Sequence, residues 1–131
     1  MEKTAVRTGR APAPFQGAPY SQGIVAGDLV FVSGQLGIDP ATGQVVEGGI
    51  GPQTEQVMTN LAAILEEAGT GLDRVVMTSI FLVALDDFQP MNEVYASHLS
   101  EPYPARATVE IAALPSGARV EIAMVAVRSP G

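Results

Sequence analysis

PARATVEI at residues 104–111 has the pattern around which this chain is organised, and RVEIA at residues 119–123 is its return. Both segments alternate apolar and polar residues, and this period of two is typical of a β-strand with one buried face. LPSGA at residues 114–118 has the composition of a turn, so we expect the two strands to form a hairpin. Opposed residues of an antiparallel pair share a face, so this pairing places Arg106 and Glu121 on the same side of the sheet.

Three other parts of the chain have the composition of strands. Residues 24–26 and 29–34 flank Gly27-Asp28 and predict a second hairpin. The second of these strands begins with a continuous apolar run, which indicates a strand covered on both faces. Residues 75–85 are rich in apolar and β-branched side chains and predict a central strand, whereas residues 45–46 predict a short edge strand.

Two segments have the apolar spacing of an amphipathic helix. The first is expected to begin at Pro52 and to end at Gly69. The second is expected to be capped by Asp86 or Asp87 and to end before Pro102. The apolar stripes of the two helices consist of Val57, Leu61, Ile64, Leu65 and Ala68, and of Phe88, Met91, Tyr95 and Leu99.

This order of elements favours an α+β fold of two layers, in which two helices cover one face of a mixed, mostly antiparallel sheet. We expect residues 1–131 to form one domain, with residues 1–14 as an extended N-terminal segment. The other face of the sheet is then open, and it is expected to carry Arg106, Thr108 and Glu121 among small apolar residues. An open face that is partly apolar implies a partner, so we expect a homo-oligomer with sites where subunits meet.

The composition excludes several classes of function. The formal net charge of -7 disfavours binding to a nucleic-acid backbone. The chain has no cysteine and one histidine, His98, so thiolate chemistry and a metal site built from several histidines are both excluded. No apolar run has the length of a signal peptide or a membrane span, and we expect a soluble, cytoplasmic protein without a metal or cofactor.

Arg106 and Glu121 are the two residues best suited to chemistry. Pro104 favours an extended approach to Arg106, whose guanidinium can hold a carboxylate through two parallel hydrogen bonds. The alternative for Arg106 is a structural salt bridge with Glu110 or Glu121. Glu121 can orient or activate a water molecule, and its alternative is simple charge pairing.

Three further polar residues can line a pocket. Tyr20 and Ser33 lie beside proline or glycine, where such residues also pack or stabilise turns. Asn92 is expected on the second helix, where the alternative is an ordinary exposed position.

Several short motifs in a fixed order resemble the RidA family (YjgF type). They cover the chain from about residue 13 to residue 127, and their order is more specific than any one of them. The motifs are APYSQG at residues 18–23, VSGQ at 32–35, QTEQVMTNL at 53–61, NEVY at 92–95, YPAR at 103–106, and LP at 114–115 followed by VEI at 120–122.

The resemblance implies a chorismate-mutase-like subunit and a homotrimer with its sites in clefts between subunits. It also implies a 2-iminobutanoate/2-iminopropanoate deaminase, which hydrolyses reactive 2-imino acids to 2-oxo acids and ammonia without a cofactor. The family arginine that binds the substrate carboxylate corresponds to Arg106, and the glutamate that positions water corresponds to Glu121. The other substrate-binding positions correspond to Tyr20, Ser33, Asn92 and Thr108.

The chain departs from the family pattern at three places. Thr108 replaces a frequent cysteine, Ala18 replaces a frequent glycine, and His98-Leu99 replaces a pair of aromatic residues. These departures bear on the preferred imine more than on the reaction.

Two other functions stay open at this point. The same cleft would serve a regulatory protein that binds small carboxylates without turnover. An RNA-cleaving inhibitor of translation is the second alternative, and the negative charge of the chain argues against it.

Overall fold

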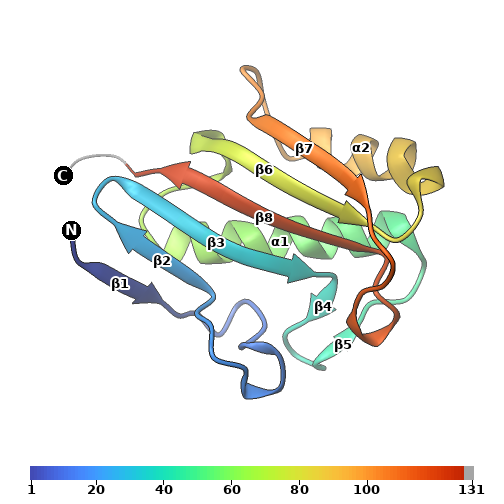
Figure 1. Cartoon of the computed structure of the whole chain (residues 1–131), viewed down its shortest axis with the longest axis horizontal. Coiled ribbons are helices and arrows are strands. Elements are labelled where there is room, and N and C mark those ends of the chain that lie inside the picture. The colour runs from blue at the N-terminus through green and yellow to red at the C-terminus, as the bar shows by residue number, and fades with distance from the viewer. Residues whose placement is uncertain (129–131) are drawn as a thin grey trace.

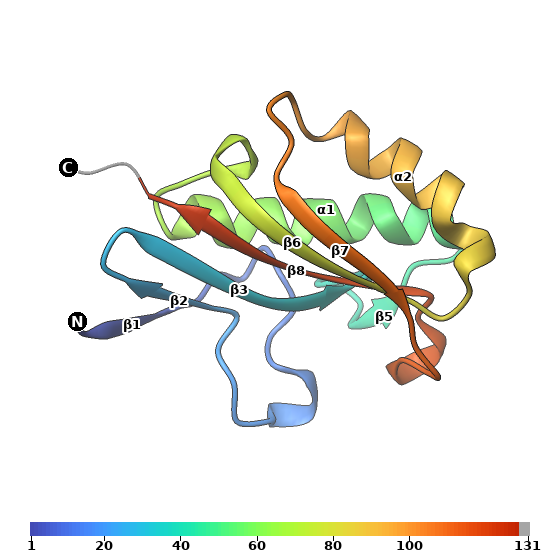
Figure 2. The same ribbon diagram turned by 45° about the horizontal axis from the view of Figure 1, so that its top comes forward.

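A six-stranded sheet with two helices on one face makes up the computed structural model, which describes residues 1–128 (Figure 1). The strands lie in the order β1-β2-β3-β8-β6-β7, and β4 and β5 form a separate two-stranded ribbon. Figure 2 shows both helices on the same side of the sheet, which leaves the other side open. The strands are β1 (Lys3–Val6), β2 (Gly23–Ala26), β3 (Leu29–Leu36), β4 (Ile38–Asp39), β5 (Gln44–Val45), β6 (Val75–Leu82), β7 (Ala105–Glu110) and β8 (Val120–Val127). The predicted α+β fold of two layers is confirmed.

The predicted hairpin between residues 104–111 and 119–123 is wrong. β6 lies between β7 and β8, pairing in parallel with β7 and antiparallel with β8. Since α2 connects β6 to β7, these strands form a crossover unit and run parallel. The alternating pattern had identified both strands, but it carries no information about which strand is the neighbour.

This pairing also separates the two predicted site residues. Arg106 lies opposite Thr78 of β6, whereas Glu121 lies opposite Phe81. Because successive residues of a strand point to opposite faces, Arg106 lies on the helix-covered face and Glu121 on the open face. Thr108, which lies opposite Ile80, shares the face of Arg106. The expectation that all three residues share the open face is therefore wrong for Arg106 and Thr108.

The hairpin of β2 and β3 is confirmed, with Ala26 opposite Leu29. Val30 and Val32 are buried, but Leu29 is 36% exposed and Phe31 is 43% exposed. The predicted cover on both faces is therefore wrong within one chain.

Helix α1 (Ile50–Glu67) begins two residues before Pro52 and ends just before Gly69. Its five predicted stripe residues are all buried in the core between the helices and the sheet. Gly69 has a φ of 87°, and the amide groups of Gly69 and Thr70 donate to the carbonyl oxygens of Glu66 and Leu65. This left-handed glycine satisfies the last carbonyl groups of the helix.

Helix α2 (Phe88–Ser97) packs against α1 and buries Met91 and Tyr95 of its predicted stripe. Asp87 occupies the position before the helix, but its side chain makes no capping hydrogen bond. The carboxylate of Asp87 binds Arg119 instead, so the predicted capping role is wrong. His98, directly after α2, contacts the carboxylate of Glu55 on α1.

The N-terminal segment contains a strand that the sequence analysis described only as extended. β1 pairs with β2, and Gln22 anchors the chain that follows β1. The side-chain oxygen of Gln22 accepts a hydrogen bond from the amide of Thr8, and its side-chain nitrogen donates to the carbonyl oxygen of Pro12.

In residues 1–128, no helix has the length and hydropathy needed to cross a membrane. The same residues contain no group of three or more His, Cys, Asp or Glu side chains arranged to hold a metal ion.

Replacing Gly69 by Ala is expected to lower the free energy of unfolding by about 1–2 kcal/mol, because an L-residue is strained in the left-handed conformation. A Cβ atom at this position would come no closer than 3.7 Å to another group, the side chain of Arg128, so the cost comes from the backbone. Urea denaturation measures the change.

Gly51→Ala is the matched control, because a Cβ atom at Gly51, in the first turn of α1, meets nothing within 4 Å. This substitution is expected to stabilise the protein by up to about 1 kcal/mol. Equal shifts of both variants in the same direction would contradict the assigned role of Gly69.

Candidate functional site

The guanidinium of Arg106 lies beside α2, and it makes no ion pair within residues 1–128. Its Nε donates a hydrogen bond of 2.9 Å to Oγ1 of Thr108. Its central carbon lies 5.3 Å from the centre of the Phe88 ring and 5.2 Å from that of Tyr95. Among residues 1–128 no carboxylate lies within ion-pair distance of Arg106, so the alternative of a structural salt bridge with Glu110 or Glu121 is wrong.

A cavity of about 310 Å³ opens in front of this guanidinium. It lies between residues 92–96 of α2 and residues 103–106, where the chain enters β7. Its lining consists of Asn92, Tyr95, Ala96, Tyr103, Pro104 and Arg106. A cationic group at the wall of a mostly apolar cavity is suited to a small carboxylate.

Tyr95 supports the guanidinium from the side of the helix. Its ring is 5% exposed, and its hydroxyl makes a buried hydrogen bond of 2.8 Å with Oγ1 of Thr78 on β6. Burial raises the pKa of the Tyr95 hydroxyl, and the hydrogen bond with Thr78 and the charge of Arg106 oppose this shift. Tyr95 is therefore a neutral phenol. Its backbone is held in α2, and its hydroxyl is held by Thr78.

Asn92 of α2 contributes a buried polar atom to the same cavity. Its Oδ1 atom has no hydrogen-bond partner within residues 1–128. Because an unsatisfied buried acceptor costs free energy, this atom is available to a donor from a ligand or from another chain.

Glu121 belongs to a second group of residues on the open face. Its carboxylate lies beside Gly34, and Gly34 belongs to the bulge between Val32 and Gln35 of β3. A Cβ atom at Gly34 would lie 2.6 Å from Oε2 of Glu121, so glycine leaves the room that the carboxylate occupies. Burial raises the pKa of the Glu121 carboxyl above its ordinary value.

Tyr20 and Ser33 lie on this second side. The hydroxyl of Tyr20 accepts a hydrogen bond of 2.6 Å from the amide of Phe15, and the hydroxyl of Ser33 donates one of 2.6 Å to the carbonyl of Ser21. Tyr20 and Gly34 line a cavity of about 530 Å³. Other polar or strained residues of its lining are Gln16, Gln35 and Ser116, and both Gln16 and Ser116 have positive φ angles.

The structure thus separates the six predicted site residues into two groups within one chain, which we call half-sites. The arginine half-site contains Asn92, Arg106 and Thr108, and the glutamate half-site contains Tyr20, Ser33 and Glu121. Phe88 and Tyr95 were not predicted as supports of Arg106, because apolar residues seven apart on a helix are also typical of ordinary core packing. The space-making role of Gly34 was not predicted either, although a glycine inside a strand pattern can indicate a bulge or a close approach.

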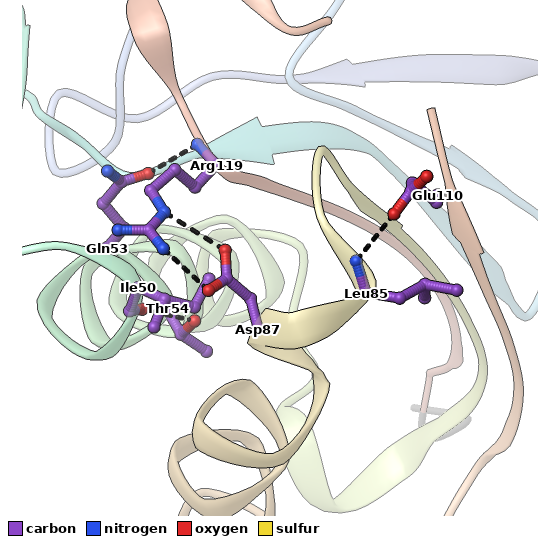
Figure 3. Close-up of polar contacts among 7 residues, drawn as sticks. All are labelled: Ile50, Gln53, Thr54, Leu85, Asp87, Glu110 and Arg119. Carbon is purple, nitrogen blue, oxygen red and sulfur yellow. Dashed lines mark hydrogen bonds and ion pairs between the residues drawn. The ribbon is translucent and has the colours of Figure 1, made fainter. Parts of the chain in front are cut away.

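An ion pair connects the elements that carry the two half-sites (Figure 3). Arg119, which precedes β8, donates hydrogen bonds of 3.1 and 2.7 Å to the carboxylate of Asp87, which precedes α2. The amide of Arg119 also donates to the side chain of Gln53 on α1, at 2.8 Å. Nearby, the carboxylate of Glu110 accepts a hydrogen bond from the amide of Leu85. The bonds of Arg119 fix the start of α2 against the start of β8, and the bond of Glu110 joins the end of β7 to the segment before α2.

Replacing Glu121 by Gln is expected to raise the free energy of unfolding at neutral pH. Burial raises the pKa of this carboxyl in the folded state, so folding disfavours its ionised form. Below the pKa of the unfolded chain both states are protonated and this advantage of the variant is absent. It develops as the pH rises from the unfolded-state pKa to the folded-state pKa, and it is fully present above the latter.

Urea denaturation of the wild type and the variant at neutral pH and at about pH 3.5, below the ordinary carboxyl pKa, measures the effect. Glu93→Gln, on the exposed surface of α2, is the control. A Glu121→Gln variant that is less stable than the wild type at neutral pH would contradict the expected sign.

Comparisons with known proteins agree with this fold and with the sequence motifs. A family model described as Endoribonuclease L-PSP matches residues 8–128. A Bos taurus protein named 2-iminobutanoate/2-iminopropanoate deaminase is 42% identical over 130 residues, which cover 99% of this chain and 93% of the bovine protein.

Two crystal structures have nearly the same backbone. RidA from an Antarctic Psychrobacter species has a TM-score of 0.90 and 46% identity, over 95% of this chain and 98% of that one. Escherichia coli TdcF, crystallised with bound serine, has a TM-score of 0.88 and 34% identity, over 96% of this chain and 99% of that one. The chain therefore belongs to the Endoribonuclease L-PSP family, and the resemblance to RidA proteins that its motifs indicated is confirmed.

Proposed function

We propose that this protein hydrolyses reactive 2-imino acids, such as 2-iminopropanoate and 2-iminobutanoate, to 2-oxo acids and ammonia. The observation that carries the proposal is the guanidinium of Arg106, which faces a small cavity and has no carboxylate partner within residues 1–128. The name of the bovine relative, a 2-iminobutanoate/2-iminopropanoate deaminase, supports the same reaction.

The reaction needs positioning more than activation. The C=N carbon of a 2-imino acid is already electrophilic, so one water molecule adds to it and the nitrogen then leaves as ammonia. In our proposal Arg106 binds the carboxylate of the substrate and fixes the C=N group near the attacking water. Glu121 accepts a proton from this water and passes it to the nitrogen, which gives a carbinolamine. The hydroxyl proton then follows by the same route, so that the C–N bond breaks, the nitrogen leaves as ammonia and the oxygen becomes the 2-oxo group. Burial brings the pKa of Glu121 closer to neutral pH, which favours proton transfer in both directions.

We infer that the complete site forms between two copies of the chain. Arg106 and Glu121 lie on opposite faces of the sheet, so one subunit cannot supply both groups to one small substrate. The open face carries the exposed side chains of Phe31 and Val109, 43% and 47% exposed, which a neighbouring subunit would cover. A closed homotrimer would contain three such sites. In each, the arginine half-site of one subunit would meet the glutamate half-site of the next.

Three of the four remaining site residues would then contact the substrate, from both subunits. Asn92 would donate or accept a hydrogen bond through an amide whose oxygen is unpartnered within residues 1–128. Tyr20 and Ser33 would close the site from the second subunit. Thr108 would lie against the guanidinium of Arg106.

A carboxylate-binding protein without turnover is the main alternative, and the serine bound to the related TdcF is compatible with it. Release of ammonia from an imine generated in the assay separates the two functions. RNA cleavage, which the description of the family model names, is disfavoured here by the net charge of -7.

Replacing Arg106 by Ala is expected to lower kcat/KM for 2-imino acids. Loss of one partner from a hydrogen-bonded charge pair costs about 2–5 kcal/mol, which corresponds to roughly 30-fold to several-thousand-fold. Ammonia release from an imine that an amino-acid oxidase produces in the assay measures the change.

Arg10→Ala is the control, since the guanidinium of Arg10 forms an exposed ion pair with Glu66 away from both cavities. This variant is expected to retain the activity of the wild type. Unchanged turnover of the Arg106→Ala variant would remove the basis of the proposed function.

A further inference from the structure

Thr108 already occupies one edge of the Arg106 guanidinium. A guanidinium has five N–H donors, one on Nε and two on each Nη atom. It can hold a carboxylate side-on, through Nε and one Nη, or end-on, through the two Nη atoms. The Nε–H of Arg106 is donated to Oγ1 of Thr108 at 2.9 Å, so the side-on edge is taken.

The aromatic contacts fix the guanidinium in a second way. Phe88 and Tyr95 lie 5.3 and 5.2 Å from its central carbon, at cation–π distance. Tyr95 is itself held by the buried hydrogen bond with Thr78. Within residues 1–128, the Nη atoms of Arg106 have no hydrogen-bond partner, and Arg106 lines the cavity. Two of the four free Nη–H donors lie on the end-on edge, which is therefore the one edge that still offers two parallel donors.

Thr108 does not line this cavity, unlike Arg106, Asn92 and Tyr103. Its hydroxyl can therefore act on a ligand through the guanidinium rather than by direct contact. This differs from the substrate-binding role that the family resemblance implied for position 108.

We propose that Thr108 is a positioning residue, which binds the Nε–H of Arg106 so that the two Nη groups receive a small 2-imino or 2-oxo acid carboxylate end-on. The identity of the ligand rests on the proposed function, whereas the orientation of the arginine does not. If the Arg106 side chain is already ordered before the ligand binds, binding costs less conformational entropy and the complex is stronger.

The test combines two substitutions at position 108 with one at position 106. Thr108→Val keeps the shape of the side chain and removes the acceptor, and Thr108→Ser keeps the acceptor. The dissociation constant of 2-oxobutanoate is measured by calorimetry for the wild type and both variants. The same three residues at position 108 are then compared in an Arg106→Lys background, which lacks the Nε–H group.

Thr108→Val is expected to weaken binding roughly three- to tenfold, the effect of leaving one long side chain free to move. Thr108→Ser is expected to stay within about twofold of the wild type, as its hydroxyl can still accept the hydrogen bond. In the Arg106→Lys background the substitution to Val should have no further effect, because the bond it removes is already absent. A loss that persists in this background would overturn the proposal, since it would show direct contact between Thr108 and the ligand.

A ligand-free readout separates this proposal from the proposed function. In ¹⁵N NMR spectra the Nε–H signal of Arg106 should exchange slowly with water in the wild type and in Thr108→Ser, and faster in Thr108→Val. Equal exchange in all three proteins would overturn the positioning role, even if the wild type hydrolyses imines. Absence of ammonia release from the wild type, with the expected exchange pattern, would instead contradict only the proposed function.

Discussion

The parallel pairing of β6 with β7 is the constraint on which the rest of the site depends. It places Arg106 opposite Thr78 on the helix-covered face, where the rings of Phe88 and Tyr95 can hold its guanidinium. If β7 paired with β8 in a hairpin, Arg106 would share a face with Glu121, and the two charges would be free to neutralise each other. The crossover through α2 prevents this, so the cation remains available to a ligand within the described part of the chain.

The two half-sites are held in a fixed relation by a second interaction. Asp87 is 5% exposed, and Arg119 binds its carboxylate through two hydrogen bonds. This pair joins the start of α2, which carries Asn92, to the start of β8, which carries Glu121. Loss of the arginine would leave a buried carboxylate uncompensated, which is costly in proteins. In an assembly of identical subunits, each subunit would contribute to two sites. The contact between Asp87 and Arg119 would then keep the distance between these two sites constant.

The sequence predicted the elements of this fold better than their partners. Apolar spacing identified both helices and their buried stripes, and alternation identified β7 and β8, because these patterns depend only on local burial. Strand neighbours depend on the path of the chain, so the face of Arg106 could not be obtained from alternation alone. The capping role expected of Asp87 failed for a similar reason, since Arg119 lies 32 residues away along the chain. The six candidate site residues came mainly from motif resemblance, and the aromatic support of Arg106 became visible only in three dimensions.

We propose that one active site takes Arg106 from one subunit and Glu121 from another. The decisive experiment mixes two inactive variants, Arg106→Ala and Glu121→Gln, through co-refolding or co-expression, and measures ammonia release from a 2-imino acid. In a randomly mixed cyclic trimer, about a quarter of the sites would contain both native residues, so activity should return to about a quarter of the wild-type level. If mixed oligomers, verified by mass spectrometry, are as inactive as either parent, the site does not form between subunits as described.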